Sequence, residues 1–176
     1  GFIEQWADTP EKLLMLVMHE LHHVILGHTR LFPTVTNVDN LVFDAVINSL
    51  LCRMFPDKEH TCFFTDFYSD SDFPACLLRP PARWRPDSPV SLPPALTPPR
   101  LSQVGQVYRS LYSQGGASYH DLYEVLRGLV NEVEVEGVIL IGDHGGGSAG
   151  GNLDQRSPIL FEAVRTIVER WPQPPD

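Results

Sequence analysis

The chain has 176 residues, with 13 basic and 22 acidic side chains and a formal net charge of −9. That length suits one domain, residues 1–176, and the negative charge argues against a nucleic-acid partner. Three cysteines, no apolar run of membrane-spanning length and no signal-peptide layout predict a reduced, cytoplasmic protein without a membrane partner.

Residues 10–27 are expected to form a helix, with Thr9 as its N-cap. This helix contains the pattern His19-Glu20-Leu-His-His23, which is HExxH. Residues four apart share one helix face, so His19 and His23 can offer two imidazole nitrogens to one zinc ion. Glu20 lies close enough to act as the general base towards water on that metal. The alternative is a core helix whose histidines bond to nearby backbone.

Residues 38–54 predict a second, mostly apolar helix with a polar stripe formed by Asn40, Asp44 and Asn48. These side chains are four apart, so they lie on one face. A buried carboxylate needs a charged partner or a metal. We therefore expect Asp44 to be the third metal ligand, and Asn48 or Asn40 to bond to a ligand imidazole. A satisfied polar seam between two helices is the alternative.

Three further histidines compete for roles at this site. His28 is the rival third ligand, if Gly27 ends the helix and turns the chain back. His144 is a less favoured candidate for the third ligand. His22 is offset from the histidine pair, so we expect it to support the site or to lie in the core.

Proline and aromatic residues dominate the middle of the chain. Residues 56–73 are aromatic and acidic, and residues 74–99 contain nine prolines. Such a proline content prevents a continuous helix and favours an extended path. Because Trp84 and several leucines are interspersed, we predict an ordered wrap across the domain that serves as an active-site lid. A plain linker is the alternative.

The last third of the chain mixes helical and strand-like patterns. Residues 101–112 and 118–129 predict helices, and residues 158–170 predict a final one. Residues 132–141 alternate between acidic and apolar side chains before an apolar end, which predicts a strand. The expected class is α+β, mainly helical, in which the HExxH helix packs on the Asn/Asp-striped helix beside a small sheet.

His144 follows the predicted strand and stands in a glycine-rich loop, where rigid scaffolds often place functional groups. Some zincins stabilise the reaction's oxyanion with a histidine from a later segment, and His144 is the candidate for that catalytic role. The alternative is a solvent-exposed loop histidine.

The two helices resemble those of zincin metallopeptidases of the gluzincin type. That resemblance implies a third ligand on the next helix, about twenty residues after HExxH, and an orienting acidic residue four positions later. Asp44 and Asn48 occupy these places. They depart from the pattern, because Asp stands for Glu and Asn for Asp.

Residues 10–55 also resemble a bacterial metallopeptidase-like domain that is often joined to a von Willebrand A-type domain. Its pattern places a histidine and an arginine after HExxH, then Asn-x-x-x-Asp-x-x-x-Asn. Here His28 falls one residue later than in that pattern, with Arg30 after it. The resemblance implies a peptidase-like site, with a partner domain or protein as a further expectation.

The favoured function is a zinc-dependent peptidase that acts on a peptide or protein substrate. An alternative is a non-catalytic binding or regulatory module, in which a fourth protein ligand closes the metal site. A di-iron bundle needs a second Glu-x-x-His pattern on another helix, and the sequence has none.

Overall fold

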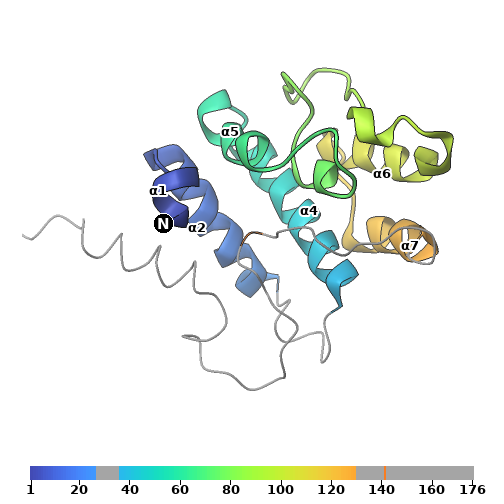
Figure 1. Ribbon diagram of the computed structural model, residues 1–176, viewed down its shortest axis with the longest axis horizontal. Helices are drawn as coiled ribbons and strands as arrows, with labels where there is room; N and C mark the ends of the chain where they lie inside the picture. Colours follow the sequence, from blue (N-terminus) through green and yellow to red (C-terminus); the bar gives the residue numbers. More distant parts are fainter. Residues whose placement is uncertain (27–35, 130–140, 142–176) are drawn as a thin grey trace, which may run out of the picture.

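The computed structural model describes residues 1–26, 36–129 and 141, which form helices joined by loops (Figure 1). The α-helices in this part of the chain are α1 (Phe2–Trp6), α2 (Pro10–Ile25), α4 (Asn37–Met54), α5 (Lys58–Phe67), α6 (Ser102–Tyr112) and α7 (Tyr119–Leu129). Three short 3-10 turns accompany them, η1 (Ala75–Leu78), η2 (Pro94–Leu96) and η3 (Pro99–Leu101). The predicted helices at 10–27, 38–54, 101–112 and 118–129 are confirmed to within two residues.

Helix α4 lies at the centre of the fold. It packs against α2 and α5 on one side and against α6 and α7 on the other (Figure 1). Its N-terminus is closed by a capping box, in which Thr36 accepts from the Asp39 amide and Asp39 accepts from the Thr36 amide. Most of its residues are buried around the whole girth, as is expected of a core helix.

Helix α2 is held at its N-terminal end by a cap and by two ion pairs. The Thr9 hydroxyl accepts from the Lys12 amide at 3.3 Å, as the sequence predicted. The Lys12 ammonium lies 3.1 Å from Asp8 and 3.1 Å from Asp66, so it joins α2 to α5. The second ion pair adds to the packing of α2 against α5.

The proline-rich segment 74–99 is an ordered wrap. The Trp84 indole donates to the Tyr112 carbonyl at 2.9 Å, and three leucines of the segment are buried in the core, Leu77, Leu78 and Leu96. The segment approaches the α2–α4 interface through its first turn, η1, which packs on α4. Its role as a lid stays a prediction.

The predicted small sheet is wrong for the part of the chain that the structure describes, because that part is helical and contains no strand. The physical reason is that one strand-like segment cannot form a sheet without a partner strand. Most of the predicted strand 132–141, and the helix 158–170, lie outside the described residues. Conversely, α5 falls in a segment for which the sequence predicted no element.

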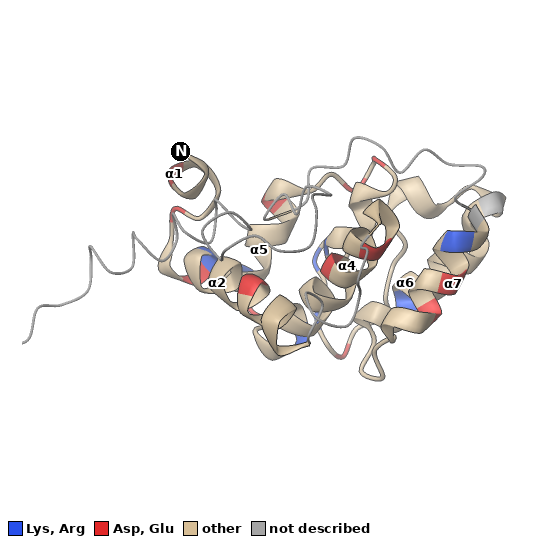
Figure 2. Ribbon diagram, turned by 90° about the horizontal axis from the view of Figure 1, so that it is seen from below, with Lys and Arg blue, Asp and Glu red and all other residues tan. Residues whose placement is uncertain are grey.

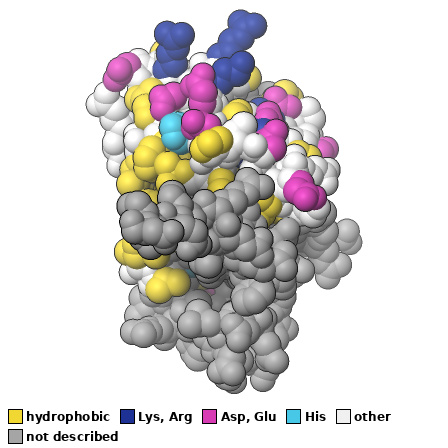
Figure 3. Space-filling model, turned by 90° about the vertical axis from the view of Figure 1, so that its left-hand side faces the viewer, with side chains coloured by type: hydrophobic (Ala, Val, Ile, Leu, Met, Phe, Trp, Pro, Cys, Tyr) yellow, Lys and Arg dark blue, Asp and Glu magenta, His cyan; other side chains and the backbone are white. Residues whose placement is uncertain are grey.

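The surface is acidic and partly apolar. Acidic side chains outnumber basic ones in the chain, and both are spread over several helices (Figure 2). Several large hydrophobic side chains of α2 are exposed, Leu14, Leu21, Val24 and Ile25. Figure 3 shows hydrophobic and acidic side chains next to each other on one face of the molecule. Within the described residues, no helix has the length and apolar character that crossing a membrane requires.

Two leucines of α2 allow a matched test of this packing. Leu16 is 0% exposed and Leu14 is 39% exposed. Leu16→Ala should lower the free energy of unfolding by about 2–5 kcal/mol, because it leaves a cavity in the core. Leu14→Ala should lower it by less than about 1 kcal/mol. Urea unfolding of the metal-free variants measures both, and equal losses would contradict the burial of this helix face.

Candidate metal centre

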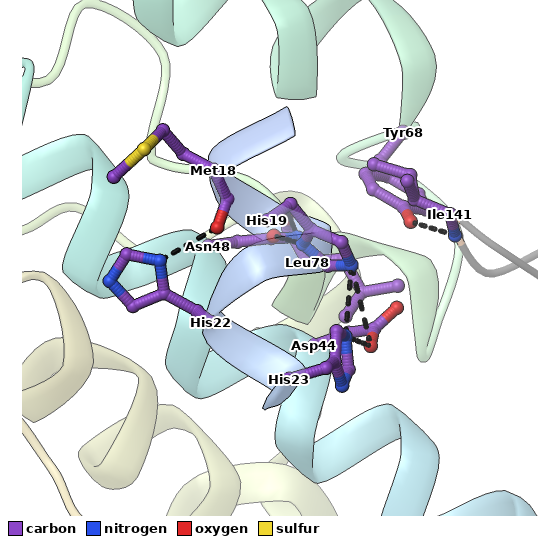
Figure 4. Close-up of polar contacts among 9 residues, drawn as sticks. All are labelled: Met18, His19, His22, His23, Asp44, Asn48, Tyr68, Leu78 and Ile141. Carbon is purple, nitrogen blue, oxygen red and sulfur yellow. Dashed lines mark hydrogen bonds and ion pairs between the residues drawn. The ribbon is translucent and has the colours of Figure 1, made fainter. Parts of the chain in front are cut away.

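Three side chains from two helices converge in the core. His19 and His23 stand four residues apart on α2 and so project from one face of that helix. Asp44 projects from the middle of α4, opposite them (Figure 4). All three are buried, and their ligand atoms lie within 4.8 Å of one another. We call these three residues the ligand group.

The spacing of the ligand group matches one metal ion. The two Nε2 atoms of His19 and His23 lie 3.1 Å apart. Asp44 Oδ1 lies 3.2 Å from His23 Nε2 and 3.7 Å from His19 Nε2. Ligand atoms that are about 2.0–2.1 Å from a tetrahedral zinc ion lie about 3.3–3.4 Å apart. The ligand group can therefore hold a metal ion with little rearrangement.

Asn48 sets the tautomer of His19. The Asn48 amide NH₂ donates to the Leu78 carbonyl at 2.9 Å, which turns its Oδ1 towards His19. His19 Nδ1 lies 2.8 Å from that oxygen and must carry the hydrogen. His19 Nε2 is then left with a lone pair, which faces the other two ligand atoms. This is the form of histidine that binds a metal.

The buried negative charge of Asp44 also favours a cation at the ligand group. Asp44 is 0% exposed, and a buried carboxylate is stable only near positive charge or strong hydrogen-bond donors. In metal-free protein, a proton on His23 Nε2 can serve this purpose, because it lies 3.2 Å from Asp44 Oδ1. A metal ion would displace that proton, so metal affinity should fall as the pH falls.

Two further side chains accompany the ligand group. Glu20 is 3% exposed and follows His19 on α2, but it is not one of the three clustered ligands. Tyr68 closes the C-terminal end of α5 and is buried. Burial raises the pKa of Tyr68 well above its ordinary value, and the charges of Asp44 and Glu20 raise it further.

The structure brings His19, His23 and Asp44 together, as the sequence predicted. Of the two candidate asparagines, Asn48 makes the contact with His19. His22 points away from Asp44 and donates from Nδ1 to the Met18 carbonyl at 2.7 Å (Figure 4).

The catalytic candidate His144 and the rival ligand His28 lie outside the described residues. Sequence reasoning missed Tyr68 and the Leu78 carbonyl. No pattern in the sequence pairs either of them with the HExxH helix.

Comparison of the chain with protein-family models, with curated proteins and with solved structures finds no match. The site is therefore interpreted from its own geometry and chemistry.

Asn48 and Asp44 should differ in their effect on metal binding. Asp44→Ala removes an anionic ligand and should abolish tight zinc binding by the isolated protein. Asn48→Ala leaves all three ligands but frees the His19 ring, so zinc affinity should fall by about 10–100-fold. Competition with a fluorescent zinc chelator measures both. Asp44→Ala protein with the zinc affinity of the wild type would exclude the two-helix site.

Proposed function

We propose that the chain is a zinc-dependent hydrolase of peptide bonds, in which Glu20 is the general base. The observation that carries this proposal is a buried glutamate adjacent in sequence to a metal ligand but outside the ligand group. In an HExxH site, the glutamate after the first histidine acts on the water bound to the metal and not as a ligand of the metal itself. A hydrolase needs it to accept a proton from water.

Zinc is the metal that we propose for the ligand group. Two histidines and one carboxylate are a known donor set of catalytic zinc sites, which keep one position for water or substrate. The same donors also suit ferrous iron in oxygenases. The HExxH arrangement favours zinc, because it places a base beside the ligands, and general-base chemistry belongs to hydrolysis.

Each residue has a distinct part in the proposed reaction. Zinc, when bound, acidifies a water molecule and polarises the scissile carbonyl. Glu20 takes the proton from the water and later delivers it to the leaving amine. Asn48 keeps the Nε2 lone pair of His19 directed at the ligand group, and the charge of Asp44 holds the cation. His144 remains the proposed oxyanion donor from outside the described residues.

The proposed substrate is a peptide or protein, and a partner domain or protein is a further proposal. Both follow from the resemblance of the HExxH helix and of Asn40, Asp44 and Asn48 to metallopeptidases. The acidic chain would repel polyanionic substrates such as nucleic acids. All three cysteines are free thiols, which fits the cytoplasmic location that we propose.

Glu20→Gln tests the assignment of the base. The substitution keeps the size and hydrogen bonding of the side chain but removes its ability to accept a proton at neutral pH. We expect zinc content to stay at about one ion per chain, and turnover of a peptide-library substrate to fall by at least about 10²-fold. Metal analysis of the purified protein and a fluorogenic cleavage assay measure the two quantities.

The matched control is Glu59→Gln on α5, an exposed glutamate that should change neither quantity. Loss of zinc from the Glu20→Gln protein would instead make Glu20 a ligand. Turnover equal to the wild type would exclude it as the base. Stable zinc binding without any turnover in the wild type would favour a non-catalytic binding module.

A further inference from the structure

An apolar stripe runs along the outer face of α2. Four of its side chains are exposed, Leu14 at 39%, Leu21 at 44%, Val24 at 58% and Ile25 at 62%. Half-buried Val17 continues it, and we call these five residues the outer stripe. Leu21 stands two positions from both His19 and His23, which places it on nearly the opposite side of the helix. The outer stripe is therefore separate from the ligand group.

The outer stripe has the spacing of a surface that packs on another helix. Its members Leu14, Val17, Leu21 and Val24 follow one another at steps of three, four and three. Alternating steps of this kind form the seam between two packed helices. A contiguous apolar surface of this kind usually marks a place where another segment or molecule binds.

Residues 158–171, which lie outside the described residues, have a matching pattern in their sequence. Their apolar side chains recur at steps of four, three and four, at Leu160, Val164, Ile167 and Trp171. Ser157 and Pro158 are the residue types that favour the start of a helix. Leu160 and Trp171 are eleven positions apart, as are Leu14 and Ile25. Eleven positions correspond to about 16 Å of helix, so the two apolar surfaces have equal lengths.

The connection between these two segments is long enough for them to meet. Ile141 is 0% exposed, and its amide donates to the Tyr68 hydroxyl at 3.2 Å (Figure 4). Tyr68 lies at the C-terminal end of α5, a helix that packs on α2. Pro158 follows Ile141 by 17 residues, which span up to about 56 Å when extended. The 16 residues of α2 measure about 24 Å, so residues 158–171 can reach any part of the outer stripe.

Charge favours a segment of this chain over a second copy as the partner of the outer stripe. Residues 158–171 contain two glutamates and two arginines, so their formal net charge is zero. A second copy would bring a further net charge of −9 to an acidic molecule, which opposes association. A tethered segment also acts at an effective concentration in about the millimolar range.

We propose that residues 158–171 dock as an amphipathic helix on the outer stripe of α2. Docking removes the exposed leucine, valine and isoleucine side chains of the stripe from water, which is favourable. It also places the HExxH helix between the core and the end of the chain. The inference is independent of the proposed hydrolase, because it concerns the face of α2 opposite His19 and His23.

Hydrogen exchange of the intact chain, followed by mass spectrometry, tests the docking through Leu21→Lys. The matched control is Met54→Lys, since Met54 is 48% exposed at the C-terminal end of α4, outside the outer stripe. Lysine has about the helix propensity of leucine and methionine, so the comparison isolates the loss of packing. We expect amides of residues 158–171 to exchange at least about tenfold faster in Leu21→Lys than in wild type or Met54→Lys.

Three results would overturn the docking. The first is exchange of residues 158–171 in wild type at the rate of an unstructured peptide. The second is equal protection of these residues in Leu21→Lys and wild type, which would mean that they pack elsewhere. The third is a dimer by light scattering that Leu21→Lys converts to a monomer, which would assign the outer stripe to a second copy.

Thiol modification keeps the inference testable if Leu21→Lys does not fold. The side chains of Leu21 and Met54 are similarly exposed, so Leu21→Cys and Met54→Cys introduce comparable thiols. With N-ethylmaleimide and peptide mass mapping, the thiol at position 21 should react at least about tenfold more slowly. Adding Ile167→Lys to Leu21→Cys should restore the faster rate. Equal rates at positions 21 and 54, or a slow rate that Ile167→Lys leaves unchanged, would contradict the docking.

Discussion

The Asp44 carboxylate, fully buried between two helices, is the constraint on which the rest of the site depends. Removing a carboxylate from water is unfavourable unless positive charge or hydrogen bonds replace the lost solvation. Two histidine Nε2 atoms lie within 3.7 Å of its Oδ1 atom. Protons or a metal ion can provide the positive charge there, and the spacing of the three ligand atoms suits a single ion.

The surrounding fold holds the ligand group in position. Two hydrogen bonds of the Asn48 side chain, one to His19 and one to the Leu78 carbonyl, connect the ligand imidazole to the first turn of the proline-rich wrap. Arg79, the next residue, bonds to Tyr68, and the Tyr108 hydroxyl donates to the Arg79 carbonyl. The neighbouring residues Leu78 and Arg79 therefore support both the Asn48 side chain that contacts His19 and the backbone of Tyr68. Its packing on α4 links the stability of the core to the geometry of the site.

The sequence predicted those site residues that repeat every four positions along a helix. His19, His23 and Asp44 could be grouped because spacings of four place side chains on one helix face. Tyr68, buried at the C-terminal end of α5, could not be found in this way. That helix has no side-chain cap bond and depends on packing against α2, which local sequence does not reveal. The prediction of a small sheet was wrong for the described residues, because alternating acidic and apolar residues in one segment do not show that a partner strand exists.

X-ray absorption at the zinc edge of the loaded wild type reports the atoms bound to the metal and so shows whether the ligand group holds it. We expect one zinc per chain with two histidine nitrogens at about 2.0–2.1 Å and a carboxylate oxygen at about 2.0–2.2 Å. The histidine signal should halve in His19→Ala protein reloaded with zinc. A sulfur ligand, or a spectrum with no histidine signal in the wild type, would exclude the ligand group as the metal site.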